Sequence, residues 1–148
     1  MQTSFTEKQL ENKDNKSSES ILRKCVHCGM CNATCPTYAI NGNELEGPRG
    51  RIYLIKDMLE NKKPANKKIA QHIDSCLSCY GCMTTCPSGV NYMHLIDHGR
   101  NHVEETYKRP LFDRLFRNIL SLTLPKPNIF LLLVIATQIV RPFSFIMH

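Results

Sequence analysis

Apolar residues recur at helical spacing in several stretches of the chain. In residues 51–60 and 66–74 they lie three or four positions apart, which predicts two helices. A longer helix is expected from residue 92 to about residue 107, and a short one over residues 19–24. The stretch Gly47-Pro48-Arg49-Gly50 is typical of a turn. This pattern predicts an all-α fold.

The two ends of the chain have opposite character. Residues 1–17 are rich in Lys, Glu, Asn and Ser, and we expect a flexible polar arm there. Beyond Pro110, apolar residues share one helical face, and the run 129–140 is mostly apolar. This run has about twelve residues, whereas a membrane-spanning helix needs about 20, so we expect it to pack on protein or to lie at a membrane surface. The apolar face consists of Leu111, Leu115, Ile119 and Leu122.

Two segments repeat the same cysteine pattern. Residues 25–36 and 76–87 each read C-x2-C-x2-C-x3-C-P, and their cysteines and proline coincide at an offset of about 51 residues. Together the two segments contain all eight cysteines of the chain. The spacing is that of bacterial two-cluster ferredoxins, in which the fourth cysteine binds the other cluster. The repeat therefore predicts two [4Fe–4S] clusters.

The spacing also predicts which cysteines share a cluster. The first three cysteines of a motif can wrap one cubane in a tight loop, whereas the fourth has moved past it. Gly29 and Gly81 lie inside the loops and would let the backbone approach inorganic sulfur. We therefore assign one cluster to Cys25, Cys28, Cys31 and Cys86, and the other to Cys76, Cys79, Cys82 and Cys35.

Clustered cysteines also occur in zinc sites and in disulfide frameworks. Zinc uses C-x2-C pairs, but rarely three evenly spaced cysteines with a fourth before proline. Disulfides are typical of secreted chains, and residues 1–20 have no apolar signal core, so we expect the reducing cytosol. The formal net charge is +6, yet no basic stripe with interleaved aromatics indicates binding to nucleic acid.

Basic residues and histidines near the motifs have two interpretations. Basic side chains close to the clusters would favour the reduced, more negative state, or else they lie on a solvated face. His27, between two ligands, is expected to donate a hydrogen bond near cluster sulfur. His94, His98 and His102 recur every four residues and are expected to form a solvated or partner-facing strip. The basic residues are Arg23, Lys24, Arg49, Arg51 and Arg100.

The stretch from Ile21 to Arg100 resembles the iron–sulfur subunits of bacterial glycolate oxidases. The sequence Gly47-Pro48-Arg49-Gly50-Arg51-Ile52 narrows the resemblance to these subunits and close relatives. Weaker similarity continues through 108–110 and 140–143. The matching segments are Ile21–Gly29, Ala33–Tyr38, Glu46–Lys56, Thr85–Val90 and Leu95–Arg100.

This resemblance implies an α-helical ferredoxin fold and a flavoprotein (FAD) partner that oxidises glycolate or another 2-hydroxy acid. It also implies a second flavin-domain subunit and electron flow from the flavin towards the respiratory chain. The complex would be cytoplasmic, with peripheral attachment to the inner membrane. Family members are longer and have two further cysteine-rich segments, so we expect the chain to be a fragment, a truncated frame or a naturally split subunit that ends before them.

The sequence thus predicts a polar arm at 1–17, a dicluster 4Fe-4S ferredoxin domain at 18–108 and a helical, partly apolar extension at 109–148. We expect an electron-transfer subunit with no catalytic site of its own. The alternative within redox chemistry is the equivalent subunit of a lactate, glycerol-3-phosphate or heterodisulfide-type oxidoreductase. The alternative outside it is a structural zinc-binding scaffold.

Metal analysis separates the cluster and zinc interpretations. Anaerobically purified protein should contain about eight irons per chain, with acid-labile sulfide, because two cubanes have four irons each. Removing the clusters should largely unfold the chain, since they join distant segments. About two zinc ions per chain without iron would contradict the cluster interpretation.

Overall fold

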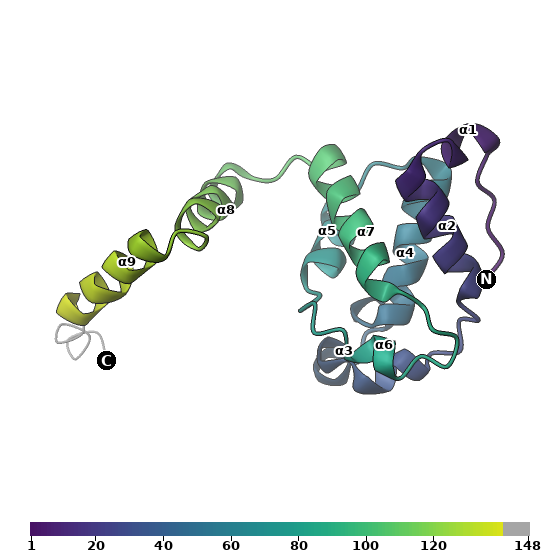
Figure 1. The fold of residues 1–148 in the computed structure, drawn as a ribbon, viewed down its shortest axis with the longest axis horizontal. Helices are drawn as coiled ribbons and strands as arrows, with labels where there is room; N and C mark the ends of the chain where they lie inside the picture. The colour runs from purple at the N-terminus through teal and green to yellow at the C-terminus, as the bar shows by residue number, and fades with distance from the viewer. Residues whose placement is uncertain (141–148) are drawn as a thin grey trace. The chain divides into compact units, whose positions relative to one another are not determined.

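The computed structural model describes residues 1–140, with side chains as far as Ile135. The chain divides into two compact units, Met1–Tyr107 and Lys108–His148. Every regular element within residues 1–140 is a helix, which confirms the expected all-α fold (Figure 1). The first unit contains α1 (Glu7–Leu10), α2 (Lys13–Lys24), the 3₁₀ helix η1 (Met30–Thr34), α3 (Pro36–Asn41), the 3₁₀ helix η2 (Glu44–Glu46), α4 (Pro48–Asn61), α5 (Lys67–Asp74), α6 (Gly81–Thr84) and α7 (Tyr92–Thr106).

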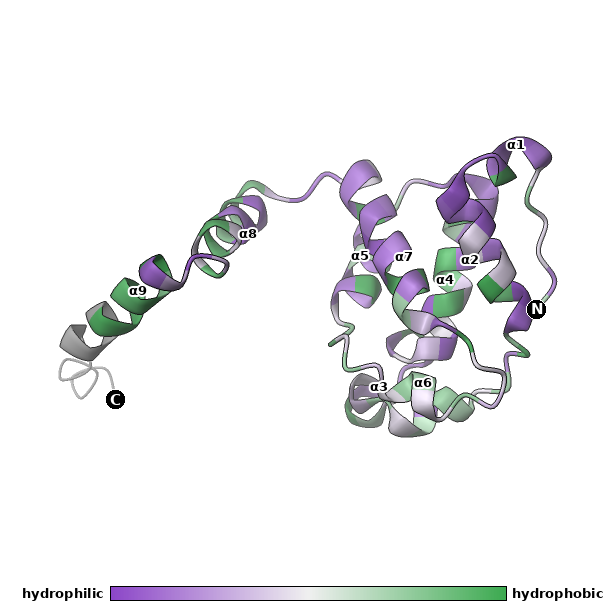
Figure 2. Cartoon of the chain, in the orientation of Figure 1, coloured by the Kyte–Doolittle hydropathy of each residue, from purple (hydrophilic) through white to green (hydrophobic). Residues whose placement is uncertain are grey.

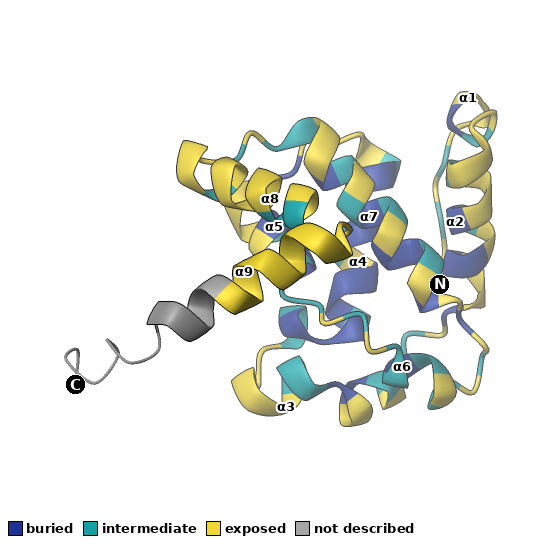
Figure 3. Ribbon diagram, turned by 60° about the vertical axis from the view of Figure 1, so that its left-hand side comes forward, coloured by how far each residue is buried: buried dark blue, intermediate teal, exposed yellow. Residues whose placement is uncertain are grey.

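Helices α4 and α7 form the centre of the first unit, with α2 and α5 packed against them (Figure 3). The central pair comes close together at Gly99 of α7, where an added Cβ would lie 2.8 Å from the Ile55 side chain. Helices α2 and α5 lead directly into the two cysteine motifs, so this core positions both. Its fully buried apolar side chains are Leu22, Ile55, Met58, Ile73, Leu95, Ile96 and Val103.

Asparagine side chains cap the N-termini of three α-helices. Asn12, Asn66 and Asn91 each accept a hydrogen bond from a backbone N–H in the first turn of α2, α5 and α7, respectively. Such caps satisfy amides that have no partner within the helix. The observed bounds of α5 and α7 differ by a residue from those that the apolar spacing predicts. Helix α2 begins six residues before the predicted start at residue 19.

Residues 1–17 differ from the flexible arm expected of them. They contain α1 and the first turn of α2, and they contact the end of α4. Gln9 is buried, and its amide donates to the carbonyl oxygens of Leu59 at 3.0 Å and Glu60 at 2.9 Å. The N–H of Ser4 donates to the Glu60 carboxylate at 2.7 Å. These bonds join distant segments and satisfy helix-end carbonyls, which local polarity does not reveal.

Residues 47–50 begin a helix where a turn was expected. Pro48 takes the first helical position of α4, where its missing N–H would have no helical partner in any case. Gly50 lies against η2, and an added Cβ would collide with the Glu44 carbonyl oxygen and lie 2.8 Å from Leu45 Cα. The packing of α4 on η2 therefore requires glycine at this position.

The second unit contains α8 (Leu111–Thr123) and α9 (Pro127–Val140). Apart from half-buried Leu120, the apolar side chains of both helices are exposed as far as Ile135, and Figure 2 shows the coloured part of α9 as largely hydrophobic. No single described helix is long and apolar enough to cross a membrane; α8 and Pro127–Ile135 meet that criterion only as a pair bent by 109°. The expected packing of the 129–140 run stays a prediction, and residues 141–148 lie outside the described chain.

Substitution of Gly50 tests the contact between α4 and η2. Gly50→Ala should lower stability by about 3 kcal/mol, the upper end for overpacking, because backbone atoms of η2 occupy the space of its Cβ. The control Gly42→Ala meets nothing within 4 Å and should lose only about 1 kcal/mol, because its φ is 63°. Thermal unfolding of cluster-loaded protein by circular dichroism measures both. Equal unfolding midpoints would contradict the close contact.

Candidate functional site

The two cysteine motifs adopt the same backbone conformation. In each, the first cysteine N–H donates to a carbonyl of the preceding helix, Cys25 to Leu22 and Cys76 to Ile73. Two further backbone bonds of the first motif recur in the second at the same offset. The bond from the Asn32 N–H to the Gly29 carbonyl corresponds to that from Met83 to Tyr80. The bond from the Cys35 N–H to the Asn32 carbonyl corresponds to that from Cys86 to Met83. The sequence repeat is therefore a structural repeat.

Left-handed backbone conformations recur at matching positions of the two loops. His27 and Ser78 have φ values of 59° and 53°, and Gly29 and Tyr80 have 86° and 55°. Gly81 begins α6, and Tyr80, which the repeat aligns with Gly29, takes the left-handed position. Non-glycine residues in this region cost about 1–3 kcal/mol each and concentrate at functional sites.

The two motifs contact each other through equivalent residues, as expected of a local two-fold axis between them. η1 packs against α6, and the Thr85 hydroxyl donates to the Thr34 hydroxyl at 3.2 Å. These two threonines occupy the same position in their motifs. A contact between equivalent positions places the end of each motif beside the loop of the other.

Two cavities result, and each is lined by cysteines of both motifs. The empty space at the first cavity is about 440 Å³ and at the second about 300 Å³, both including space open to solvent. The predicted set Cys25, Cys28, Cys31 and Cys86 lines the first cavity, together with Cys82. The predicted set Cys76, Cys79, Cys82 and Cys35 lines the second. The structure thus brings together the cysteines that we assigned to each cluster, and ligation itself stays a prediction.

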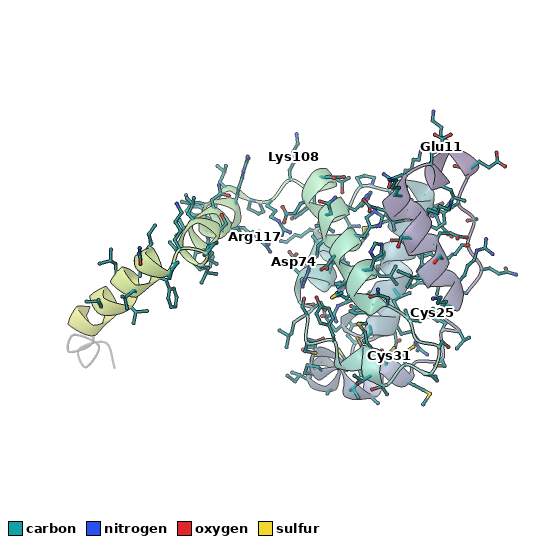
Figure 4. All side chains as sticks on the ribbon, viewed as in Figure 1. Glu11, Cys25, Cys31, Asp74, Lys108 and Arg117 are labelled. Carbon is teal, nitrogen blue, oxygen red and sulfur yellow. The ribbon has the colours of Figure 1, made fainter. Side chains whose placement is uncertain are left out.

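All eight cysteines are free thiols, and their exposure follows the repeat in part. Cys28 and Cys79, the second cysteine of each motif, are exposed, whereas Cys25 is buried and Cys31 is half-buried (both labelled in Figure 4). Burial, reinforced by neighbouring cysteines, raises the pKa of Cys31 to about 11 and that of Cys82 to about 12. These thiols hold their protons at neutral pH until a metal displaces them.

A buried polar network lies beside the second cavity, with Arg51 at its centre. The Arg51 side chain is 1% exposed and pairs with Glu46 at 2.9 Å. Its Nε donates to the His72 carbonyl at 2.7 Å, and its Nη2 also donates to the Ser75 hydroxyl at 3.0 Å. Its Nη1 lies 4.0 Å from Cys35 Sγ. Arg51 thus connects α4 with η2, with α5 and with the fourth cysteine of the first motif.

Glu46 is held ionised by the same network. Burial opposes its charge, but hydrogen bonds from Ser75 and His72 and the charge of Arg51 hold the pKa of the Glu46 carboxyl below its usual value. His72 Nδ1 lies 2.6 Å from this carboxylate. The buried charge of Arg51 therefore has a charged partner, as burial requires.

Hydrogen-bond donors surround the sulfurs at the second cavity. Burial opposes ionisation of Cys35, but the Thr37 hydroxyl and nearby backbone amides lower the pKa of this thiol, aided by the charge of Arg51. Cys35 is the N-cap of α3, so first-turn amides point towards its sulfur. The hydroxyl of buried Tyr92 donates to Cys76 Sγ at 3.6 Å.

The remaining basic residues near the motifs have separate roles. Arg100 donates to the Ser78 hydroxyl and to the Cys76 carbonyl, both at 2.6 Å, and so fixes the second loop. Arg49 lines the first cavity and pairs with Glu44. Of the five basic residues predicted to influence the clusters, Arg23 and Lys24 are exposed, and Arg23 pairs with Glu19.

The histidines on α7 are half-buried, so they do not form the solvated strip that was one of the two expectations, and the alternative of a partner-facing strip stays a prediction. His98 Nδ1 lies 2.7 Å from the Ser18 hydroxyl of α2, and burial lowers the pKa of His98. His102 Nε2 lies 2.9 Å from the Lys63 carbonyl. His27 lines the first cavity, and its Nδ1 is buried without a hydrogen-bond partner among the described residues.

The donor sets fit iron–sulfur clusters. Each cavity is lined by the four thiols assigned to its cluster, with Cys82 as a fifth at the first cavity, and thiols are the soft ligands that such clusters use. Within residues 1–140, no group of three or more His, Cys, Asp or Glu converges closely enough to hold a single metal ion. The thiols of each set therefore surround a cavity and do not meet at one point.

Comparisons with known proteins agree with this chemistry. Residues 21–90 match the protein family described as the 4Fe-4S dicluster domain. The chain is 50% identical over 143 residues to the glycolate oxidase iron-sulfur subunit of Escherichia coli (strain K12), covering 97% of this chain and 35% of that protein. This similarity confirms the resemblance expected from the sequence.

Two further relatives are more distant. The probable glycolate oxidase iron-sulfur subunit of Bacillus subtilis (strain 168) is 34% identical over 119 residues, covering 79% of this chain and 27% of that protein. The succinate dehydrogenase iron-sulfur subunit of Paracoccus denitrificans is 28% identical over 76 residues, covering 47% of this chain and 29% of that protein. The chain thus spans about a third or less of the length of these relatives. No solved structure matches it significantly.

Double substitutions test which cysteines share a cavity. Cys86→Ser with Cys28→Ser should remove one cluster and leave about four irons per chain, because both residues line the first cavity. Cys86→Ser with Cys79→Ser should remove both clusters. Cys35→Ser with Cys79→Ser should remove only the second cluster, and Cys35→Ser with Cys28→Ser should remove both. Iron and acid-labile sulfide analysis distinguishes these outcomes, and a same-motif pattern would refute crossed ligation.

Proposed function

We propose that the chain transfers electrons through two [4Fe–4S] clusters, one in each cavity, because residues 21–90 match the family described as the 4Fe-4S dicluster domain. The observation that carries this proposal is that each cavity gathers three cysteines of one motif with the fourth cysteine of the other, while Cys82 also lines the first cavity. What such a cluster supplies when bound is the uptake and release of one electron.

The residues around the cavities suit electron transfer and not a reaction that makes or breaks covalent bonds of a substrate. Four thiolates per cluster would leave no iron open to a substrate. Cys82, Pro48 and Tyr92 line both cavities, so the two clusters would lie on either side of a thin shared wall. That arrangement favours rapid exchange of an electron between them.

The edges of both cavities reach the protein surface, where a partner can exchange electrons. Cys28 and Cys79 are exposed. Val26 and Leu77, at matching positions beside the first cysteines, are each 67% exposed. Exposed apolar side chains next to a cofactor suit a transient contact with a redox partner.

The donor that we propose is an FAD-containing flavoprotein that oxidises glycolate or a related 2-hydroxy acid. Support comes from the relatives named as glycolate oxidase iron-sulfur subunits, one of them 50% identical. Oxidation of glycolate to glyoxylate releases two electrons and two protons. Two one-electron sites together can accept both electrons, while the protons leave to solvent from the flavin.

We further propose a cytoplasmic complex that includes a second flavin-domain subunit and lies at the inner membrane. The support is the similarity to the glycolate oxidase subunits together with the exposed apolar side chains of α8 and α9. The electrons would continue towards the respiratory chain.

Reduction by a flavoprotein and its substrate tests the proposed electron donor. Cluster-loaded protein, mixed anaerobically with a glycolate-oxidising flavoprotein, should lose visible absorbance when glycolate is added, because reduced clusters absorb less. Cys28→Ser with Cys79→Ser, which changes one ligand at each cavity, is the control and should show no such bleaching. Bleaching by lactate or glycerol 3-phosphate with their own flavoproteins, and not by glycolate, would assign a different donor.

A further inference from the structure

We propose that Arg51 and Tyr92 raise the reduction potential of the cluster in the second cavity. Each acts through a hydrogen bond to a ligand sulfur, Arg51 to Cys35 and Tyr92 to Cys76. Neither residue is a cluster ligand, and each would influence the reduction potential only through the ligand sulfur that it contacts. The inference rests on the proposed function, because it requires clusters in the cavities.

Arg51 cannot turn away from Cys35. Its Nε is held by the His72 carbonyl at 2.7 Å, and its Nη2 by Glu46 at 2.9 Å and Ser75 at 3.0 Å. The remaining nitrogen, Nη1, contacts Cys35 Sγ at 4.0 Å in a buried setting. A guanidinium is planar, so fixing two nitrogens fixes the direction of the third.

The charge of Glu46 does not cancel the effect at the sulfur. Its carboxylate also bonds with His72 and Ser75, on the side of α5. The ion pair therefore presents its N–H end to Cys35. Local dipoles of this kind act strongly at short range in a protein interior.

Tyr92 is the second hydrogen-bond donor, and the sulfur that it contacts belongs to the second cysteine motif. The residue is buried, and its hydroxyl donates to Cys76 Sγ at 3.6 Å. Arg51 and Tyr92 thus reach two different ligands of one cavity, one from each cysteine motif.

Reduction adds one negative charge, part of which spreads onto the ligand sulfurs. N–H and O–H donors stabilise the more negative state and so raise the potential. Among the described residues, no side-chain N–H or O–H donates to a cysteine sulfur that only the first cavity contains. There, Asn32 presents its amide oxygen, an acceptor, to Cys31 at 4.0 Å, while its Nδ2 donates to Glu44. The hydrogen bonds of Arg51 and Tyr92 therefore act on ligands of the second cavity.

Tyr92→Phe is the most direct test, because it removes one hydroxyl and keeps the ring. Redox titration of the cluster-loaded chain, followed by electron paramagnetic resonance, should show one midpoint potential lowered and the other unchanged. Loss of the bond should reduce the equilibrium constant for uptake of one electron by up to about tenfold. This corresponds to a midpoint potential lowered by up to about 59 mV. Repeating the titration with Cys28→Ser, which damages the first cluster, should retain the shifted signal.

Arg51→Lys provides an independent second variant, which keeps the charge and loses the planar fork. It should lower the same potential. The control is Tyr53→Phe, the same chemical change at an exposed tyrosine whose ring lies 6.2 Å from the His27 ring; it should change neither potential.

The results separate the two proposals. Absence of iron from the unchanged chain would overturn the proposed function. Full iron content with unshifted potentials in Tyr92→Phe and Arg51→Lys would overturn only the role of these residues. A shift confined to the first-cavity cluster would do the same.

Discussion

The packing of η1 against α6 is the contact on which the rest of the first unit depends. It joins segments about 51 residues apart in the sequence, and equivalent residues, Thr34 and Thr85, meet there. Because of this symmetry, each motif sends its fourth cysteine to the cavity of the other. Between the motifs, α4 packs against η1 and η2, and α5 packs against α4, α7 and η2. The geometry of each site is thus a property of the whole unit and not of either motif alone.

The network around Arg51 shows how the fold reconciles a buried charge with a metal site. Burial of an ion pair costs desolvation energy that good geometry only partly offsets. Here Glu46, His72 and Ser75 satisfy the polar atoms, and the same bonds connect η2, α4 and α5. The network therefore fixes the relative position of these elements, while one guanidinium nitrogen remains directed at Cys35. Structural and electrostatic roles are combined in one side chain.

The sequence predicted the parts that depend on local periodicity or on the repeat. Helices α5 and α7 and the grouping of the cysteines follow from spacing alone. It did not predict the bonds of Gln9 to the end of α4, because those partners are about 50 residues away. Nor did it distinguish Arg51 from the exposed Arg23, since both are basic residues near a cysteine. Tyr80 was missed because its left-handed conformation is unusual for an aromatic residue.

The thin wall between the cavities has a consequence for the resistance of the protein to air. Pro48, Cys82 and Tyr92 form this wall, and Cys82 is itself one of the proposed ligands. Dioxygen that destroys one cluster would leave an emptied chamber that opens towards the other. In air, loss of one cluster should therefore speed the loss of the other, whereas a variant kept free of oxygen can retain a single cluster.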